Sequence, residues 1–172
     1  MIATRLWAPL AWLGGDTSQA WAHDALLEID AAGYWSNIAT NVSHEDAQLQ
    51  GATVVFGPLL PGVVNAHSHA FQRAFAGLSE RRDNEHDDFW SWRDRMYRIA
   101  GAITPAQLRA VAGQLYGELL RGGYTEVCEF HYLNHAPGAR PGDDPMAMTQ
   151  PLIDAAAEVG IGLTLLPVLY ER

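Results

Sequence analysis

The chain has 172 residues, 48% of them hydrophobic and 18% charged, and its formal net charge is −9. This acidic balance argues against nucleic-acid binding, which requires a basic surface, and no stretch approaches the ~20 apolar residues of a membrane span. The single cysteine, Cys128, excludes an internal disulfide and indicates a reducing compartment, the cytoplasm. Because Cys128 stands in an apolar strand, we expect a buried structural thiol rather than a nucleophile.

Residues 1–60 are predicted to form a small all-β unit. Its first apolar stretch, residues 6–13, imitates a secretion signal, but Pro9 and three nearby tryptophans favour strands and turns. Strand-forming residues and turn residues together predict a turn at 14–16 and β segments that include residues 25–30, 34–38 and 52–56.

The next strand carries a pair of histidines. An apolar run over residues 61–66 leads into His67-Ser68-His69, and strand alternation places His67 and His69 on one side with Ser68 on the other. Two neutral imidazoles at this spacing form half of a zinc-type site. The alternative is a pair of polar residues at the mouth of a loop, but the apolar strand led in by Pro-Gly favours the metal.

The rest of the chain alternates between helix and strand. The connection over residues 70–100 is aromatic and basic, and a helix is expected over residues 87–97 with Phe89, Trp90 and Met96 buried. Thr104-Pro-Ala-Gln107 is a capping box that begins a helix ending at Gly122. The apolar residues that keep helical spacing along this helix are Leu108, Val111, Leu115, Leu119 and Leu120.

Two further strands complete the pattern. They are expected over residues 124–130 and 161–170, separated by a loop over residues 133–145 and a helix over residues 149–159 that ends at Gly160. The order strand, helix, strand, helix, strand predicts parallel βαβ units, so the fold class is α/β.

Three motifs together are far more specific than the histidine pair alone. They are residues 67–77, residues 89–97 and residues 129–135, and together they resemble the formimidoylglutamate deiminase family of the amidohydrolase superfamily. The resemblance implies that residues 61–172 are the first three βα units of a metal-dependent (β/α)8 TIM barrel, and that residues 1–60 are part of a small β-sandwich domain. We therefore expect an N-terminal portion of a longer enzyme, which alone is neither active nor stably folded.

The same resemblance implies a reaction and a set of site residues. The reaction is the hydrolysis of N-formimidoyl-L-glutamate to N-formyl-L-glutamate and ammonia in histidine degradation. Water activated by one divalent ion, zinc, would attack the formimidoyl carbon, with His67 and His69 as metal ligands and the other ligands and proton-transfer residues downstream. Arg93 matches the position expected to bind a substrate carboxylate, and Gln72 and Tyr132 are further substrate-binding candidates. The implied partners are a small anionic substrate and, by analogy, a second copy of the full-length chain.

Other polar residues allow more than one interpretation. His131 and His135 qualify as metal ligands on composition, but alternation sends His131 and Tyr132 to opposite faces, and we prefer a structural role for His131. The expected ion pairs join Arg73, Arg95 and Arg98 to Asp87, Asp88 and Asp94. The expected surface histidines are His23, His44 and His86.

Two other functions remain open at this point. One is a different deaminase of the amidohydrolase superfamily, acting on guanine, cytosine or adenosine-type substrates. The other is a non-catalytic β-rich binding protein, in which His67 and His69 lie in a polar loop.

Overall fold

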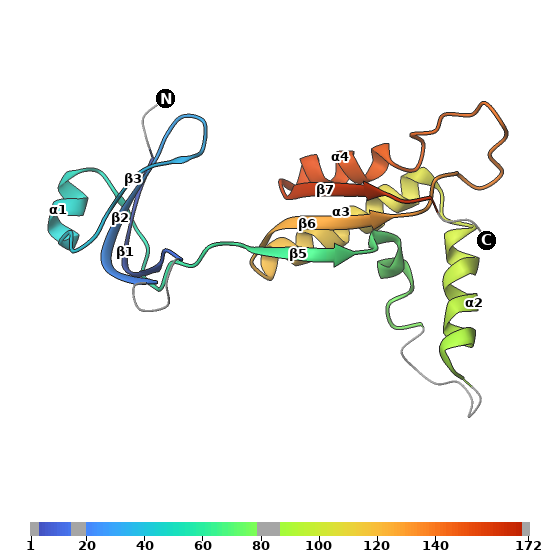
Figure 1. Ribbon diagram of the computed structural model, residues 1–172, viewed down its shortest axis with the longest axis horizontal. Coiled ribbons are helices and arrows are strands. Elements are labelled where there is room, and N and C mark those ends of the chain that lie inside the picture. The colour runs from blue at the N-terminus through green and yellow to red at the C-terminus, as the bar shows by residue number, and fades with distance from the viewer. Residues whose placement is uncertain (1–3, 15–19, 79–86, 170–172) are drawn as a thin grey trace. The chain divides into compact units, whose positions relative to one another are not determined.

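The computed structural model of the chain describes residues 4–14, 20–78 and 87–169 (Figure 1). The chain folds into two compact units, Met1–Pro61 and Gly62–Arg172. His86 and part of the turn expected at residues 14–16 lie outside the described residues.

The N-terminal unit is built on one sheet. Its strands are β1 (Thr4–Trp12), β2 (Trp21–Ile29), β3 (Trp35–Ala39) and β4 (Thr53–Val54), in the order β3-β2-β1-β4. Neighbours pair antiparallel except β1 and β4, which are parallel. Residues 6–12 therefore lie within a paired strand, and the β segments predicted at residues 25–30 and 34–38 lie in β2 and β3, which pair antiparallel.

The same unit contains a helix, α1 (His44–Leu49), so the all-β prediction was wrong. Ser43 caps this helix, because its side chain accepts a hydrogen bond from the Asp46 backbone N–H at 3.1 Å. Ala47 is buried in a cluster with Trp7 and Leu26. His44 and His23 are exposed, as predicted.

The second unit is a parallel sheet covered by helices. Its strands are β5 (Val63–Ser68), β6 (Tyr124–His131) and β7 (Gly162–Pro167), in the order β5-β6-β7. The main crossover helices are α3 (Pro105–Arg121) and α4 (Gln150–Val159), which pack on each other and on β6 and β7, respectively. Figure 1 shows the three strands of the sheet running in the same direction. The predicted parallel βαβ units are confirmed, and the unit is a mixed α/β structure.

Capping residues set the ends of both crossover helices where the sequence predicts them. Thr104 accepts a hydrogen bond from the Gln107 backbone N–H at 3.3 Å, and the Gln107 side chain accepts one from the Thr104 N–H at 2.9 Å. α3 ends at Gly122, and α4 ends at Gly160, whose φ of +83° is in the left-handed region that glycine adopts readily.

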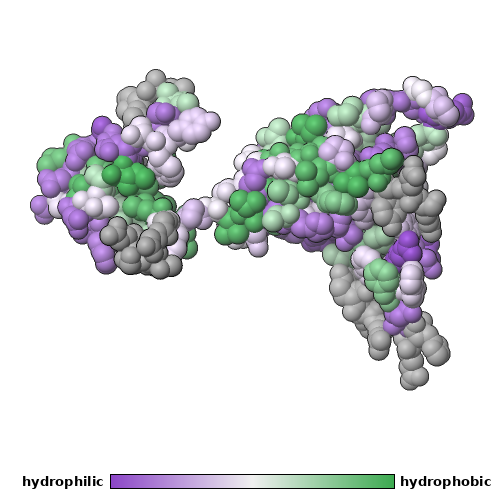
Figure 2. Space-filling view, in the orientation of Figure 1, coloured by the Kyte–Doolittle hydropathy of each residue, from purple (hydrophilic) through white to green (hydrophobic). Residues whose placement is uncertain are grey.

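The core of this unit lies between the sheet and the helices. The fully buried line along α3 is formed by Leu108, Ala112 and Tyr116, and the predicted Leu115, Leu119 and Leu120 are partly buried beside it. Val127 of β6 and Leu152 of α4 close the core from the other elements. Other apolar side chains of the strands remain exposed, and Figure 2 shows apolar surface over this unit.

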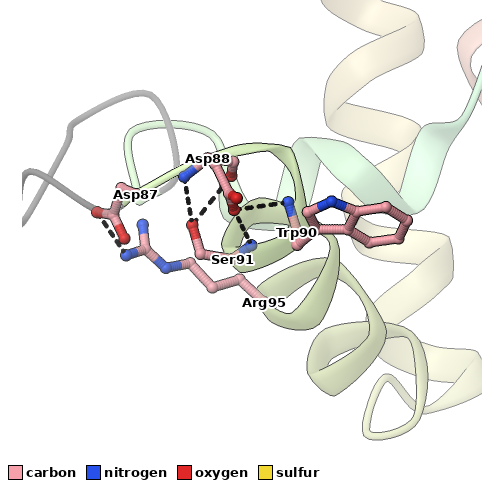
Figure 3. A network of polar contacts seen from close by, with 5 residues as sticks. All are labelled: Asp87, Asp88, Trp90, Ser91 and Arg95. Atoms are coloured by element: carbon pink, nitrogen blue, oxygen red, sulfur yellow. Dashed lines mark hydrogen bonds and ion pairs between the residues drawn. The ribbon is translucent and has the colours of Figure 1, made fainter.

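Between β5 and α3 the chain forms two helices, the 3-10 helix η1 (Ala70–Phe75) and α2 (Phe89–Ala100). Figure 3 shows the start of α2: an Asp88 carboxylate oxygen accepts from the backbone N–H groups of Trp90 and Ser91 at 2.9 and 3.0 Å. The Ser91 hydroxyl in turn accepts from the Asp88 N–H at 3.1 Å. This reciprocal pair is a capping box.

The burial predicted for α2 is correct only for Met96. Phe89 and Trp90 are each 62% exposed, because they occupy the first turn and pack against each other, with ring centroids 5.5 Å apart. Met96 is 6% exposed and faces the core.

The charged side chains follow the prediction in one case. Arg95 forms the expected ion pair with Asp87, at 3.1 Å. Asp88 is instead the cap of α2, and Arg98 donates to the backbone carbonyl of Asp94 at 3.4 Å rather than to its carboxylate.

Arg73 has a different acidic partner from the one predicted. Its Nε and Nη2 atoms donate to the two carboxylate oxygens of Glu118 on α3, each at 2.8 Å.

Cys128 also departs from the prediction, since its side chain is half-buried rather than buried. Among the described helices, none is both long and apolar enough to cross a membrane.

Candidate metal centre

His67 and His69 lie at the carboxyl end of β5. Their Nε2 atoms are 3.1 Å apart, and the ring centroids are 4.6 Å apart in an edge-to-face arrangement. Ser68, between them, is only 7% exposed and lies in register with Glu129. The strand alternation seen in the sequence therefore brings the two imidazoles together on one face.

A backbone carbonyl sets the orientation of His69. Its Nδ1 lies 2.9 Å from the Phe130 carbonyl oxygen, which can only accept, so Nδ1 carries the proton and donates. This tautomer leaves a lone pair on Nε2, directed at His67. Burial lowers the pKa of His69 and the neighbouring His67 adds to the effect, while the bond to Phe130 opposes it. His69 is therefore a neutral imidazole at neutral pH, the form that binds metal.

Two aromatic rings, one at the end of β6 and one directly after it, contact the pair. The Phe130 ring lies 5.6 Å from the His67 ring and 5.5 Å from the His69 ring, and the Tyr132 ring lies 5.1 Å from that of His69. These contacts restrict the rotation of both imidazoles, so two apolar ring faces from the second strand hold the candidate ligands in place.

Gln72 and Tyr132, both predicted from the sequence, meet beside His69. The Gln72 side-chain amide donates to the Tyr132 hydroxyl at 3.5 Å. Both groups also contact the sulfur of Met96, the amide at 3.7 Å and the hydroxyl at 3.6 Å. A thioether is a weak acceptor, so either group can exchange this contact for a stronger one to a bound molecule.

Arg93 lies one turn before Met96 on α2. Its guanidinium stacks over the Trp90 ring at 5.4 Å and the Tyr97 ring at 5.1 Å, and its Nη2 donates to the Tyr97 hydroxyl at 3.2 Å. In the sequence Arg93 follows Trp90 and Trp92, and the structure pairs it with Trp90 and Tyr97. Met96 provides the contact between α2 and the strand ends, and it thereby connects the helix that carries Arg93 to Gln72 and Tyr132.

Comparison with known proteins agrees with this arrangement. Residues 59–171 match the sequence profile of the amidohydrolase family, which is about two thirds of the chain. The chain belongs to the amidohydrolase family. It is 46% identical to a formimidoylglutamate deiminase from Pseudomonas aeruginosa over 154 residues, which cover 90% of this chain and 33% of that protein.

Two solved structures resemble this amidohydrolase chain. An amidohydrolase from Brucella melitensis superposes with a TM-score of 0.80 at 38% identity, over 97% of this chain and 35% of that one. An atrazine chlorohydrolase from Arthrobacter aurescens, complexed with zinc, superposes with a TM-score of 0.69 at 22% identity, over 97% and 35%. The second likeness shows the fold alone. The chain thus spans about a third of the length of the relatives it matches.

The histidine pair of this amidohydrolase fits a tetrahedral metal. Two nitrogens bound to zinc at ~2.0–2.1 Å lie about 3.3–3.4 Å apart, close to the 3.1 Å between the two Nε2 atoms. Within the described residues, no group of three or more His, Cys, Asp or Glu side chains is arranged to hold a metal. His67 and His69 are therefore candidates for two ligand atoms, and a complete metal site would need further ligands.

His131, on the opposite face of β6, and His135, in the loop that follows, lie apart from this pair. His131 is 3% exposed, and burial lowers its pKa, partly offset by a hydrogen bond with the Leu133 backbone. It lies on the core side of the strand, away from Tyr132, as the alternation predicts. His135 is exposed in the following loop.

Glu129 is the residue that the sequence analysis missed. It is 2% exposed, and its Oε1 accepts a hydrogen bond from the Ala70 backbone N–H at 2.5 Å. Burial raises the pKa of Glu129, while the bonds from Ala70 and Ser68 lower it. A carboxylate two residues before a histidine, on the same face of the strand, was the available signal.

Proposed function

We propose that the protein to which this chain belongs hydrolyses N-formimidoyl-L-glutamate to N-formyl-L-glutamate and ammonia, a step in histidine degradation. The observation that carries the proposal is the 46% identity to a formimidoylglutamate deiminase over 90% of the chain. The histidine pair and the polar residues beside it supply chemistry that suits this reaction.

The fold supports the proposal that the site belongs to a (β/α)8 barrel. Three parallel strands with crossover helices on one face are the repeating unit of a (β/α)8 barrel, and active sites of that fold lie at the carboxyl ends of the strands. His67, His69 and Tyr132 lie at the carboxyl ends of β5 and β6. On this proposal residues 61–172 are the first three βα units of the barrel, and residues 1–60 belong to a small β-sandwich domain.

His67 and His69 would hold one divalent metal ion, and we propose zinc, with the other ligands contributed by sequence outside this chain. The geometry of the pair and the fixed tautomer of His69 support this assignment. A bound zinc ion would lower the pKa of a coordinated water from 15.7 to roughly 7 and so provide the nucleophile at neutral pH.

The substrate is a small dianion, and the chain has a net charge of −9, so a local cation is needed to bind it. Arg93 can bind a carboxylate through two parallel hydrogen bonds, in a bidentate arrangement. The Trp90 and Tyr97 rings limit the orientations of its guanidinium. Gln72 and Tyr132 can exchange their weak contacts with Met96 for hydrogen bonds to the formimidoyl group or the α-substituents.

The test uses the full-length protein with zinc quantified. Ammonia release is measured with formimidoylglutamate, guanine, cytosine and adenosine. We expect turnover of formimidoylglutamate alone; turnover of a nucleobase or nucleoside in its place would refute the proposed substrate. A folded, metal-free protein that turns over none of them would favour a binding protein instead.

A further inference from the structure

The buried face of β6, defined by Val127, Glu129 and His131, contains an unusual group of polar atoms. Among the described residues, three buried side-chain atoms lack a hydrogen-bond partner: the Tyr116 hydroxyl, Glu129 Oε2 and His131 Nε2. All three belong to side chains that are 3% exposed or less. Burying a carboxylate is costly unless its hydrogen bonds compensate, so the presence of Glu129 requires a reason beyond filling the core.

The contacts of Glu129 supply that reason. Its Oε1 accepts from the backbone N–H of Ala70 at 2.5 Å, and Glu129 lies directly beside Ser68 in the parallel pairing of β5 and β6. Ser68 and Ala70 are the two neighbours of His69 in the sequence. The buried carboxylate of Glu129 therefore holds the backbone directly after one candidate metal ligand, and the strand pairing at Ser68 holds the backbone directly before it.

The next residue of β6 acts on the same histidine from the other face. The Phe130 carbonyl accepts from His69 Nδ1 at 2.9 Å. Residue 130 thus fixes the imidazole ring, while residue 129 fixes the backbone from which that ring projects. At this point β5 gives way to η1, and His69 itself has φ −133° and ψ 85°, outside both helix and strand values. His69 lies just beyond the last paired residue of β5, Ser68.

We infer that Glu129 is a positioning residue for the metal centre, which fixes the backbone at Ser68–Ala70 so that His69 Nε2 stays directed at His67 Nε2. The inference rests on the proposed function, because it requires these two histidines to bind metal. Glu129 itself does not contact the metal or the substrate; its carboxylate acts through the Ala70 backbone.

The experiment compares three variants in the full-length protein. Glu129→Met keeps the length of the side chain but removes its acceptor, and it should weaken zinc binding about 10- to 100-fold, the loss typical of supports to metal ligands. Glu129→Gln keeps an oxygen for the Ala70 N–H and should stay within about threefold of wild type. Tyr116→Phe removes a neighbouring buried polar atom that has no partner and should leave zinc affinity unchanged.

Zinc dissociation constants come from chelator competition, and the visible spectrum of the Co(II)-substituted protein reports ligand geometry. Leu152→Ala, a core variant on α4, controls for general loss of stability, because it should lower Tm without altering either readout. A Co(II) spectrum that changes in Glu129→Met and recovers in Glu129→Gln distinguishes positioning from simple destabilisation.

Failure of the inference and failure of the proposed function give different experimental results. If wild type binds zinc through His67 and His69 but Glu129→Met has the same affinity and spectrum, the inference is wrong and the proposed function stands. If wild type retains no metal, both are wrong. Should Glu129→Met not fold, Glu129→Ala removes the same acceptor with a smaller side chain and should weaken zinc binding at least about tenfold; an unchanged affinity there also overturns the inference.

Discussion

Successive residues of β6 point to opposite sides of the sheet, and the two sides differ in what they contact. Cys128, Phe130 and Tyr132, which directly follows the strand, are half-buried, and the last two contact the candidate metal ligands. Val127, Glu129 and His131, on the buried face, are 0%, 2% and 3% exposed and lie toward the helices. One strand thus has an accessible face next to the histidine pair and a closed face in the core.

The difference shows that a short segment can place groups near the candidate metal ligands on one face and buried structural groups on the other. The accessible face carries groups with weak or exchangeable contacts, such as Tyr132 against the Met96 sulfur. The buried face carries groups that cannot exchange their contacts with solvent, such as Glu129. Substitutions on the first face should therefore alter metal or substrate binding, whereas most substitutions on the second should alter stability.

The strongest test of this comparison is to remove a candidate ligand. In the full-length protein, His67→Ala or His69→Ala should lower zinc affinity by more than about 100-fold and abolish activity, because a direct ligand matters more than its supports. The free energy of unfolding without metal should change little. Zinc content after dialysis and ammonia release provide the measurements.

His23→Ala is the matched control for the ligand variants, since His23 is exposed in the N-terminal unit. It should behave as wild type. Stoichiometric zinc and normal turnover in either His67→Ala or His69→Ala would show that the pair does not bind the metal.

A second prediction extends the comparison from β6 to α2. Arg93→Met should weaken formimidoylglutamate binding and leave zinc in place, because a bound carboxylate would lose its charged partner at a cost of ~2–5 kcal/mol. Steady-state kinetics and zinc analysis measure the two effects separately. Arg98→Met makes the same change at an exposed position of the same helix and should have no effect; equal kinetics in the two variants would show that Arg93 does not bind substrate.

The third prediction concerns the histidine on the buried face. His131→Ala should lower the free energy of unfolding by about 2–4 kcal/mol, because it leaves a cavity in a close-packed core. It should not reduce zinc affinity. Chemical denaturation and chelator competition on the same sample test both statements, and loss of zinc with normal stability would move His131 to the metal centre.

A smaller effect is expected for Tyr116→Phe. The Tyr116 hydroxyl is buried without a described partner, and burial, with the charge of Glu129 adding to it, raises the pKa of Tyr116 above its usual range. Removing the hydroxyl should change the free energy of unfolding by no more than about 1 kcal/mol, in the stabilising direction. Thermal denaturation that shows a clear loss would mean that the hydroxyl has a partner, such as a buried water.

The smallest predicted effect is the pH dependence of the Arg73–Glu118 pair. Hydrogen bonds from Arg73 and Gln114 lower the pKa of Glu118 from 4.5 to about 2. A lowered acid pKa means that the stabilisation is complete above pH ~4.5 and is lost as the pH falls toward ~2. Because the pair is largely solvated, the difference in Tm between wild type and Glu118→Gln should be at most about 3 °C at pH 6 and should disappear near pH 2. A difference that is independent of pH would contradict this.

Several features follow from the sequence alone because they depend on neighbours in the chain. The capping box of Thr104 and Gln107 and the stop at Gly160 set the ends of two helices through local hydrogen bonds and backbone conformation. The shared face of His67 and His69 follows from strand alternation. Ser43 and Asp46 are a local signal of the same kind for α1, and it was overlooked.

Other features depend on which segments pack together, and local sequence does not encode that choice. Arg73 has acidic residues near it in sequence but pairs with Glu118, 45 residues away, because η1 lies against α3. Phe89 and Trp90 are apolar yet exposed, since the first turn of α2 points away from the core that Met96 enters.

The candidate site combines features that local sequence determines with features that depend on tertiary packing. Its two histidines could be selected from a stretch of three residues, because the period of a strand places them together whatever the rest of the chain does. The groups that orient them could not. The carboxylate of Glu129 is 59 residues from Ala70, and the Phe130 carbonyl is 61 residues from His69. These residues come into contact only when β5 and β6 pair in parallel register. The helices packed on the sheet stabilise that pairing by burying Val127 and its neighbours.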